Sequence, residues 1–354
     1  NARLTIDSRV QHIVETELDK AMIKHRPKGI MAVVVRPSTG EIIAMANRPD
    51  FDPNRPGDFP AGHRRNRAVT DIAEPGSTFK AVTVAAALNE RQVSLSTVFD
   101  CERGSFYYGG RRLRDHHPYH RLSVKEIITK SSNIGSAKVA LRLGSSKLHR
   151  YIHQFGFGER TRISLPGEVR GTVHPLTRWN KLSITRVPMG HEVAATPIQM
   201  AMMASAIANK GKLMRPMLLR QLEDEHGRVV VKYHSEAVRQ VVTPDTARKV
   251  TEALKTVVKP GGTASRAALE YYSVAGKTGT AQKAGRGGYI PGKYYSAFVG
   301  FFPADRPALC IYVALDEPTG DYYGGLTAAP VFKAIGERAA SYLGIKPDLA
   351  SIAS

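Results

Sequence analysis

Residues 74–88, Glu-Pro-Gly-Ser-Thr-Phe-Lys-Ala-Val-Thr-Val-Ala-Ala-Ala-Leu, are the most informative stretch of this sequence. Pro75 and Gly76 precede a run of good helix formers, an order typical of the entry into a helix. Ser77 is therefore expected at or just inside the helix N-terminus, and Lys80 follows three residues later. Because positions i and i+3 share a helix face, the two side chains are predicted to be neighbours.

A serine beside a lysine is a candidate nucleophile with its base. The Ser77 hydroxyl is a weak nucleophile at its ordinary pKa and needs a nearby group that takes its proton. Lys80 can be that group, since burial and the positive charge of Lys277 both disfavour its charged form. The pattern alone is short and common, and Ser77 as a simple N-cap with a solvated Lys80 is the alternative.

Two further motifs favour the catalytic interpretation. Residues 130–135, Lys-Ser-Ser-Asn-Ile-Gly, supply a Ser-x-Asn element between two helical stretches. Residues 275–282, Ala-Gly-Lys-Thr-Gly-Thr-Ala-Gln, supply a Lys-Thr-Gly element within a β pattern. Three short motifs in this order and in these contexts are the signature of a serine acyl transferase.

The second motif supplies groups that move and hold protons. Ser131 can relay a proton between Lys80 and a departing amine, and Asn133 can hold Lys80 in place and bond a substrate amide. Both residues are therefore predicted to be catalytic, together with Ser77, Lys80 and Lys277.

The third motif is predicted to bind substrate. Thr278 and Thr280 offer hydroxyls, and Lys277 a charge, to a substrate carboxylate. Gly279 removes a side chain from the strand, so that a substrate backbone can lie along it. The backbone N–H groups of Ser77 and Thr280 are the natural pair for an oxyanion hole.

The hydrophobic pattern predicts an α/β (α+β) fold around one antiparallel sheet of about five strands. A helix is expected over residues 8–24, followed by a hairpin of strands 29–35 and 41–46. Isolated hairpins are too small to be stable, so the N-terminal hairpin and the C-terminal strands are expected to share one sheet. The middle is predicted to be a large, mostly helical insertion, and residues 1–354 to be a single domain. The other expected elements are strands 272–276, 296–302 and 308–315, and helices 78–89, 124–143, 197–209, 244–257 and 330–343.

With its three motifs, the sequence resembles the transpeptidase domain of class B penicillin-binding proteins, and most of all the cell-division (septal) subgroup, which includes the spore-cortex proteins. Supporting stretches lie at residues 4–11, 195–200 and 324–332, so the resemblance spans nearly the whole chain. It implies a peptidoglycan D,D-transpeptidase that cross-links stem peptides through an acyl-Ser77 intermediate. β-Lactam antibiotics would acylate the same serine. The residues 191–193, His-Glu-Val, depart from the glycine-rich pattern of the family.

The resemblance also implies partners and a location. The substrates would be a D-Ala-D-Ala donor stem peptide and an amine acceptor. A glycosyltransferase and membrane proteins of the divisome would bind through an N-terminal region absent from this chain. A membrane anchor and a pedestal domain in that region would place the protein on the outer face of the bacterial cytoplasmic membrane, in the periplasm or cell envelope. No cofactor, metal or nucleic acid is implied.

Two alternatives share the acyl-serine chemistry. A serine β-lactamase needs a base for deacylation, and no Glu-x-x-Leu-Asn-like segment stands where a class A enzyme has one. A penicillin-sensing receptor domain would need a transmembrane signalling segment. From a different class, the motifs would be coincidental in a basic module that binds polyanions.

Composition narrows the class of protein further. The 354 residues carry 51 Lys+Arg against 31 Asp+Glu, a formal charge of +20, with 42% hydrophobic residues. This is a globular composition whose charge favours an anionic partner. Segments 55–67, 103–121 and 277–293 carry +3, +4 and +4 of that charge, and all three flank the motifs. Cys101 and Cys310 match no metal or redox spacing and are expected to be unpaired thiols.

Two weaker signals remain. Residues 115–120, Asp-His-His-Pro-Tyr-His, are predicted to be a polar surface loop, with metal binding as the alternative. Residues 285–292 are rich in glycine and are predicted to form a mobile loop at the rim of the cleft, with a substrate-contacting role as one possibility.

Overall fold

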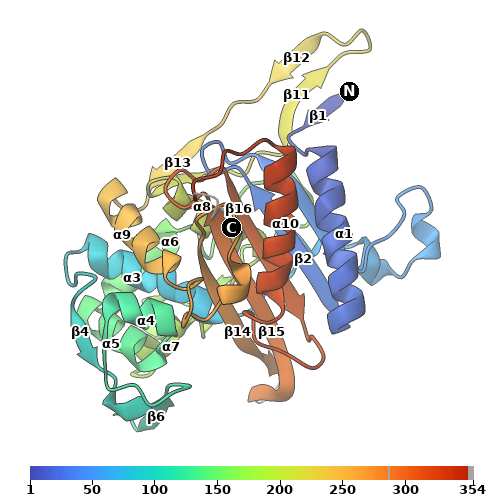
Figure 1. The fold of residues 1–354 in the computed structure, drawn as a ribbon. Helices are drawn as coiled ribbons and strands as arrows, with labels where there is room; N and C mark the ends of the chain where they lie inside the picture. Colours follow the sequence, from blue (N-terminus) through green and yellow to red (C-terminus); the bar gives the residue numbers. More distant parts are fainter. Residues whose placement is uncertain (286–287, 350–354) are drawn as a thin grey trace, which may run out of the picture.

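The structure, a computed structural model, describes residues 1–285 and 288–349. Among these residues, five strands form one antiparallel sheet in the order β14-β15-β16-β2-β3. The N-terminal and C-terminal parts of the chain lie side by side in it, as the blue and the orange to red strands of Figure 1 show. The predicted α+β architecture, a sheet split by a long insertion, is confirmed. The strands are β2 (Gly29–Val35), β3 (Ile42–Arg48), β14 (Ala275–Gly285), β15 (Gly288–Phe302) and β16 (Leu309–Asp316).

Helices cover both faces of this sheet. Helices α1 (Ser8–His25) and α10 (Ala328–Tyr342) pack on one face, and α8 (Pro197–Ala208) packs on the other. Helix α1 buries the stripe that its sequence predicts, and the Asp7 carboxylate caps it by accepting from the first backbone N–H groups. Helix α8 is buried on every side, as expected of a helix that is apolar all round.

The helical part of the insertion lies beside the β14 edge of the sheet (Figure 1). The predicted helix 124–143 is wrong in one respect, because it is interrupted at Ser131 and Ser132. Ser131 has a left-handed backbone with φ of 59°, and the Ser132 hydroxyl accepts from Gly135 N as the N-cap of a new helix. The helices of this region are α3 (Lys80–Asn89), α4 (Val124–Lys130), α5 (Asn133–Leu143), α6 (Ser145–Gln154), α7 (Ser183–Arg186) and α9 (Pro244–Lys255), and α2 (Arg67–Thr70) precedes them.

The middle of the chain holds, besides the predicted helices, several short strand pairs that the sequence did not indicate. Strand β11 pairs with β1 on one side and with β12 on the other, and β11 and β12 project from the body at the top of Figure 1. These strands are four or five residues long and none of their residues is buried, in contrast to the buried runs of the central sheet. The bounds are β1 (Ala2–Leu4), β4 (Val98–Asp100), β5 (Ser105–Tyr108), β6 (Arg111–Arg114), β7 (Arg121–Ser123), β8 (Thr172–Val173), β9 (Val193–Ala194), β10 (Lys212–Met214), β11 (Leu219–Glu223), β12 (Val229–Lys232) and β13 (Ala237–Gln240).

The predicted rim loop 285–292 is a strand over most of its length. β14 and β15 stay paired beyond the cleft, with Ala284 opposite Tyr289 and Gly285 opposite Gly288. Arg286 and Gly287 lie outside the described residues. The hairpin therefore extends the sheet past the third motif.

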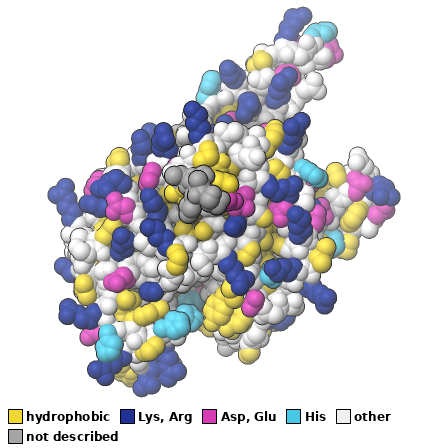
Figure 2. Space-filling view, in the orientation of Figure 1, with side chains coloured by type: hydrophobic (Ala, Val, Ile, Leu, Met, Phe, Trp, Pro, Cys, Tyr) yellow, Lys and Arg dark blue, Asp and Glu magenta, His cyan; other side chains and the backbone are white. Residues whose placement is uncertain are grey.

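The surface is rich in Lys and Arg over the whole visible face (Figure 2). A group of these side chains gathers over the β5–β6 hairpin, where Arg111 and Arg112 are exposed. Cys101 and Cys310 are buried free thiols, as predicted. Within residues 1–285 and 288–349, no helix has the length and apolar character needed to cross a membrane.

Candidate active site

The turn that carries Ser77 is a short 3-10 helix, Gly76–Phe79, that leads directly into α3. Gly76 has φ of 56°, and Gly190 packs on it so closely that a Cβ on Gly190 would lie 2.3 Å from the Gly76 carbonyl oxygen. Ser77 remains partly exposed, whereas Lys80 has an exposed fraction of 0%. The predicted helix entry therefore presents the serine and buries the lysine.

The buried Lys80 amine joins the first motif to the second. Its Nζ donates to Ser131 Oγ at 3.1 Å, to Asn133 Oδ1 at 2.8 Å and to the Ser131 carbonyl oxygen. In the part of the chain that the structure describes, no hydrogen bond joins it to Ser77 Oγ. All three hydrogen bonds of the Lys80 amine are thus made to residues of the second motif.

Lys277 completes a row of three groups. Its Nζ donates to Ser131 Oγ at 3.0 Å, so the one hydroxyl accepts from both lysines. Lys277 is also 0% exposed. The structure thus brings the predicted residues Lys80, Ser131, Asn133 and Lys277 into contact across three separate motifs.

Burial sets the protonation of both lysines. Desolvation of the ammonium lowers the pKa of Lys80 to about 7, and the Asp115 carboxylate acts in the opposite direction. Desolvation, followed by the charge of Lys80, also lowers the pKa of Lys277 well below its ordinary value. The predicted lowering of the Lys80 pKa is therefore present, with burial as its cause, and the mutual repulsion falls on Lys277.

Asp115 is a site residue that the sequence did not reveal. Its carboxylate accepts from Ser132 Oγ at 2.7 Å, from Ile134 N at 3.1 Å and from Asn133 N. An acidic group at a helix N-terminus is favoured by the free N–H groups and by the dipole. Asp115 therefore fixes the start of α5, which carries Asn133. The surface-loop interpretation of residue 115 was wrong, since this carboxylate faces inward.

The remaining residues of the predicted polar loop lie at the cleft. His116, His117 and Tyr119 line the cavity that contains Ser77. Of the residues with described positions, no three or more His, Cys, Asp or Glu side chains gather closely enough to hold a metal ion.

The third motif lies on the free edge of the sheet. The Thr280 carbonyl oxygen lies beside Gly76, so the outer edge of β14 at this residue faces the Ser77 turn. The N–H and C=O of one strand residue point to the same side, which directs the Thr280 N–H to the cleft. A Cβ on Gly279 would lie 2.8 Å from the Pro75 carbonyl oxygen. The missing side chain of Gly279 thus lets β14 approach the Ser77 turn closely.

A cleft runs along this edge. Ser77 and Thr280 line two adjoining cavities of about 500 Å³ and 280 Å³. Ser131 and Thr278 line the larger of the two. Tyr322 closes one side, stacked between Tyr294 and Tyr323 at ring distances of 4.0 and 4.5 Å. The serine is thus accessible to a ligand that follows β14.

The segment before Ser77 is tied to the β14–β15 hairpin. The Glu74 carboxylate accepts from the Tyr289 hydroxyl at 3.0 Å and lies 2.8 Å from His191 Nδ1. Burial alone would raise the pKa of Glu74, but the hydrogen bond and charge of His191 outweigh it and hold that pKa below its ordinary value. His191, in the segment that departs from the family pattern, therefore helps to wall one end of the cleft.

Comparisons with known proteins agree with this geometry. Residues 30–337 match the family described as the penicillin binding protein transpeptidase domain. The chain is 40% identical over 353 residues to Stage V sporulation protein D of Bacillus subtilis, which covers 98% of this chain and 54% of that protein. It is 33% identical over 350 residues to peptidoglycan D,D-transpeptidase FtsI of Escherichia coli K12, covering 98% of this chain and 57% of that protein. The chain spans about half the length of these relatives.

Solved structures show the same fold. The apo transpeptidase domain of penicillin-binding protein 3 from Burkholderia pseudomallei is similar with a TM-score of 0.87 and 32% identity, covering 98% of each chain. Penicillin-binding protein 3 of Mycobacterium tuberculosis in complex with aztreonam is similar with a TM-score of 0.90 and 31% identity, covering 100% of this chain and 82% of that one.

Proposed function

Because the chain belongs to the penicillin-binding protein transpeptidase domain family, of class B, we propose that it is the catalytic domain of a peptidoglycan D,D-transpeptidase. The observation that carries this proposal is the buried Lys80, held between Ser131 and Asn133 next to the Ser77 turn. A lysine with a pKa of about 7 can take the serine proton near neutral pH.

In the proposed acylation, Ser77 Oγ attacks the carbonyl carbon of the penultimate D-Ala of a donor stem peptide, and its proton passes to Lys80. The N–H groups of Ser77 and Thr280 stabilise the oxyanion of the tetrahedral intermediate. The C–N bond then breaks, and the leaving D-Ala amine takes a proton through the Ser131 hydroxyl, which both lysines contact.

The acceptor half of the reaction reverses these proton transfers. An amine of a neighbouring stem peptide attacks the acyl carbon, and its proton passes through Ser131 and Lys80 to Ser77 Oγ as the ester C–O bond breaks and Ser77 is released. Lys277, Thr278 and Thr280 would bind the donor carboxylate, and Asn133 the donor amide. β-Lactams would acylate the same serine, and the aztreonam complex of a structural relative supports this part of the proposal.

The biological setting is proposed from the family. The relatives named Stage V sporulation protein D and FtsI support a role in septal or spore-wall synthesis, on the outer face of the cytoplasmic membrane. A glycosyltransferase and divisome membrane proteins would act with the whole protein.

Release of D-Ala tests the proposed reaction. The wild type and Ser77→Ala are incubated with a pentapeptide that ends in D-Ala-D-Ala, with and without a diamine acceptor. The proposal predicts D-Ala release that Ser77→Ala abolishes, and a cross-linked product when the acceptor is present. Equal release by both proteins would refute the acyl-serine route, and hydrolysis without any cross-linked product would favour a hydrolase.

A further inference from the structure

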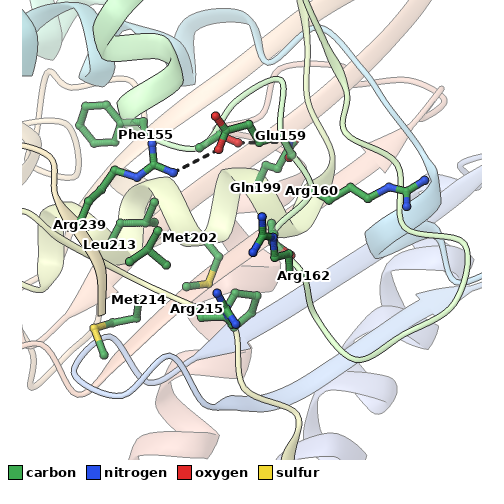
Figure 3. A pocket seen from close by; sticks show the side chains of 14 residues that line it. Phe155, Glu159, Arg160, Arg162, Gln199, Met202, Leu213, Met214, Arg215 and Arg239 are labelled. Atoms are coloured by element: carbon green, nitrogen blue, oxygen red, sulfur yellow. Dashed lines mark hydrogen bonds and ion pairs between the residues drawn. The ribbon is translucent and has the colours of Figure 1, made fainter. Parts of the chain in front are cut away.

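A cavity of about 170 Å³ lies outside the catalytic cleft, and none of its described lining residues lines the cavities at Ser77. It opens between the end of α6, helix α8 and strands β10 and β13 (Figure 3). Its floor is apolar, since Phe155, Met202 and Leu213 are 1%, 2% and 6% exposed. An engineered cavity of about 150 Å³ binds benzene, so this one has room for one aromatic or branched aliphatic group.

Positive charge surrounds this apolar floor. Arg239 pairs with Glu159 at 3.1 Å, and Arg215 pairs with Glu236 at 2.9 Å. The cavity is also lined by Arg160 and Arg162. Neither has a carboxylate within 4.0 Å of its guanidinium group among the residues whose positions are described. An anionic ligand would therefore find guanidinium groups that the protein itself leaves uncompensated. The four arginines of the lining are Arg160, Arg162, Arg215 and Arg239.

The turn that presents Arg162 is held in an unusual backbone conformation. Arg162 has φ of 62°, which is left-handed and rare for a residue with a long side chain. The buried Glu168 fixes it by accepting from Thr161 N at 2.6 Å and from Arg162 N at 3.0 Å. The carboxylate of Glu168 thus satisfies backbone donors and does not neutralise the guanidinium.

The cavity continues into a neighbouring hollow. Arg160 and Arg162 line both, and Leu165 and Pro166 belong to the second hollow. In Figure 3 the Arg160 side chain extends away from the apolar floor, whereas Arg162, Arg215 and Arg239 surround it. A ligand that contacts both hollows must be elongated.

The cavity and the neighbouring hollow together form a continuous groove. We propose that this groove binds an extended acidic peptide segment of a partner protein. One apolar side chain of the segment fills the cavity beside α8. A carboxylate on one side of it pairs with the uncompensated Arg162, and a carboxylate on the other side shares Arg215 with Glu236. The planar guanidinium groups match carboxylates in a bidentate manner, and the enclosed apolar anchor supplies the desolvated centre of the interface. This proposal is independent of the acyl-transfer reaction, since no group assigned to that reaction lines the groove.

Fluorescence anisotropy with short peptides tests the proposal. The probe is a fluorescein-labelled pentapeptide, Glu-Asp-Phe-Asp-Glu, titrated with the whole chain at about 150 mM salt. Two control peptides, Lys-Lys-Phe-Lys-Lys and Glu-Asp-Gly-Asp-Glu, reverse the charge and remove the anchor in turn. Each control is expected to bind at least about tenfold more weakly. Equal binding of the Gly and Phe peptides, or no binding of the probe at about 1 mM protein, would overturn the proposal.

Variants separate the groove from general attraction to a chain with a net charge of +20. Arg162→Glu is expected to weaken binding of the probe at least about tenfold, and Arg215→Gln provides an independent second variant. The control is Arg306→Glu, which makes the same charge change in the exposed turn before β16 and is expected to alter affinity less than about twofold. Equal weakening by Arg162→Glu and Arg306→Glu would show that only net charge matters. Melting temperatures confirm that each variant is folded.

Discussion

Lys80 is the residue on which the proposed chemistry depends. When protonated, its three N–H groups match the three acceptors on Ser131 and Asn133. When neutral, it keeps two N–H groups and gains a lone pair that can accept a proton. The Ser131 hydroxyl is the partner best able to reverse its role, because a hydroxyl can also donate. Burial places the pKa of Lys80 at about 7, so both forms are populated near neutral pH.

The rate of acylation by a penicillin is therefore expected to rise with pH and to reach half its maximum near pH 7. The neutral amine is the active base, and its fraction grows as pH passes the pKa of Lys80. Lys80→Arg stays charged and should slow acylation by about 10²- to 10⁴-fold above pH 7, and its profile should lack the rise near pH 7. Stopped-flow measurements between about pH 5.5 and about pH 9 check this. A flat profile for the wild type would argue against Lys80 as the base.

Asp115→Asn is expected to have two separable effects. Loss of the charged acceptor at the start of α5 should lower the free energy of unfolding by about 1–3 kcal/mol. Because the Asp115 carboxylate raises the pKa of Lys80, its removal should also move the midpoint of the pH–rate profile to lower pH. The exposed Asp58→Asn serves as the control and should change neither quantity.

A merely structural role of Asp115 would lower stability and leave the midpoint in place. That outcome would contradict the electrostatic part of the argument. The sequence does not reveal the role of Asp115, because its carboxylate accepts from backbone N–H groups that are distant in the chain. Such a contact has no sequence motif. The neighbouring histidines make the segment that begins at Asp115 resemble a polar surface loop.

At the level of elements, the Ser77 turn is held by backbone packing between loops. Gly190 contacts Gly76 so closely that a methyl group would meet three backbone atoms within 3 Å. The Gly190→Ala change should therefore displace the Ser77 turn, lower stability and slow acylation. A matched control is Gly227→Ala, whose φ of 77° is similar to the 79° of Gly190 but whose Cβ would meet nothing within 4 Å.

Gly227→Ala is expected to cost about 1 kcal/mol of stability, the backbone penalty alone, and to leave acylation unchanged. Gly190→Ala should cost at least about 2 kcal/mol. Thermal unfolding and penicillin acylation of both variants give the comparison. Equal losses would mean that the contact with Gly76 has no influence on the serine.

The elements that the sequence predicted well are those whose signal is local. The central strands are nearly continuous apolar runs, and α1 has a clear stripe with an Asp7 cap. The second motif lies between two helices, as its sequence indicates, but the periodicity of 124–143 conceals the break at Ser131, which depends on a left-handed residue and on caps. The grouping of the motifs followed from their order, whereas the absence of a Ser77–Lys80 hydrogen bond is a matter of rotamers that no sequence pattern specifies.

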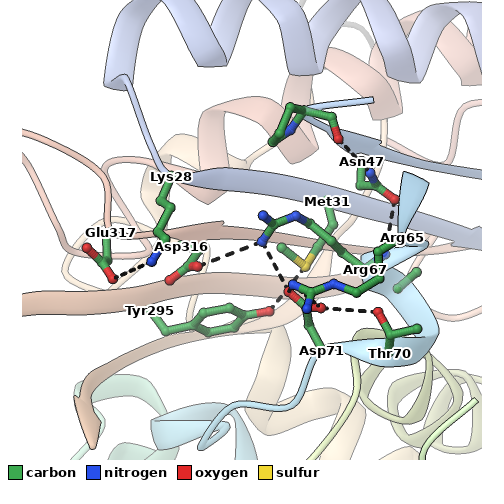
Figure 4. A network of polar contacts seen from close by, with 12 residues as sticks. Lys28, Met31, Asn47, Arg65, Arg67, Thr70, Asp71, Tyr295, Asp316 and Glu317 are labelled. Carbon is green, nitrogen blue, oxygen red and sulfur yellow. Dashed lines mark hydrogen bonds and ion pairs between the residues drawn. The ribbon is translucent and has the colours of Figure 1, made fainter. Parts of the chain in front are cut away.

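Over the whole molecule, the three basic segments 55–67, 103–121 and 277–293 differ in how many of their positive side chains pair with carboxylates. In the segment 55–67, Arg67 pairs with Asp71 at 3.1 Å and approaches Asp316 at 3.9 Å (Figure 4). In the segment 277–293, Lys283 and Lys293 pair with Glu317, and Lys277 is buried. The Arg67–Asp316 contact ties the chain before Ser77 to the sheet, and the pairs together offset much of the charge expected at the cleft.

The segment 103–121 keeps exposed positive charge near the cleft. Within the described part of the chain, Arg111 and Arg112 have no carboxylate within 4.0 Å, while His116 and His117 of the same segment line the Ser77 cavity. This segment is therefore the best source of any field that draws anionic substrates to Ser77.

Acylation by the anion benzylpenicillin is accordingly expected to slow several-fold when salt rises from about 50 to about 500 mM. The zwitterionic ampicillin should be less sensitive, and Arg112→Glu should reduce the salt dependence more than Arg306→Glu does. Second-order rate constants for the two compounds provide the measurement. A rate constant that does not change with ionic strength would contradict electrostatic attraction of the substrate. The net charge of +20 would then serve another function, such as contact with an anionic membrane.

The central claim, an acyl-enzyme on Ser77, is tested most directly by intact-protein mass spectrometry after incubation with benzylpenicillin. The wild type is predicted to gain the mass of one penicillin and to carry it on the peptide that contains Ser77. This acyl-enzyme is predicted to last much longer than the acyl-enzyme of a β-lactamase, which is rapidly hydrolysed. Ser77→Ala should gain no mass. A wild type that stays unlabelled, or a Ser77→Ala protein that is labelled equally, would contradict the claim.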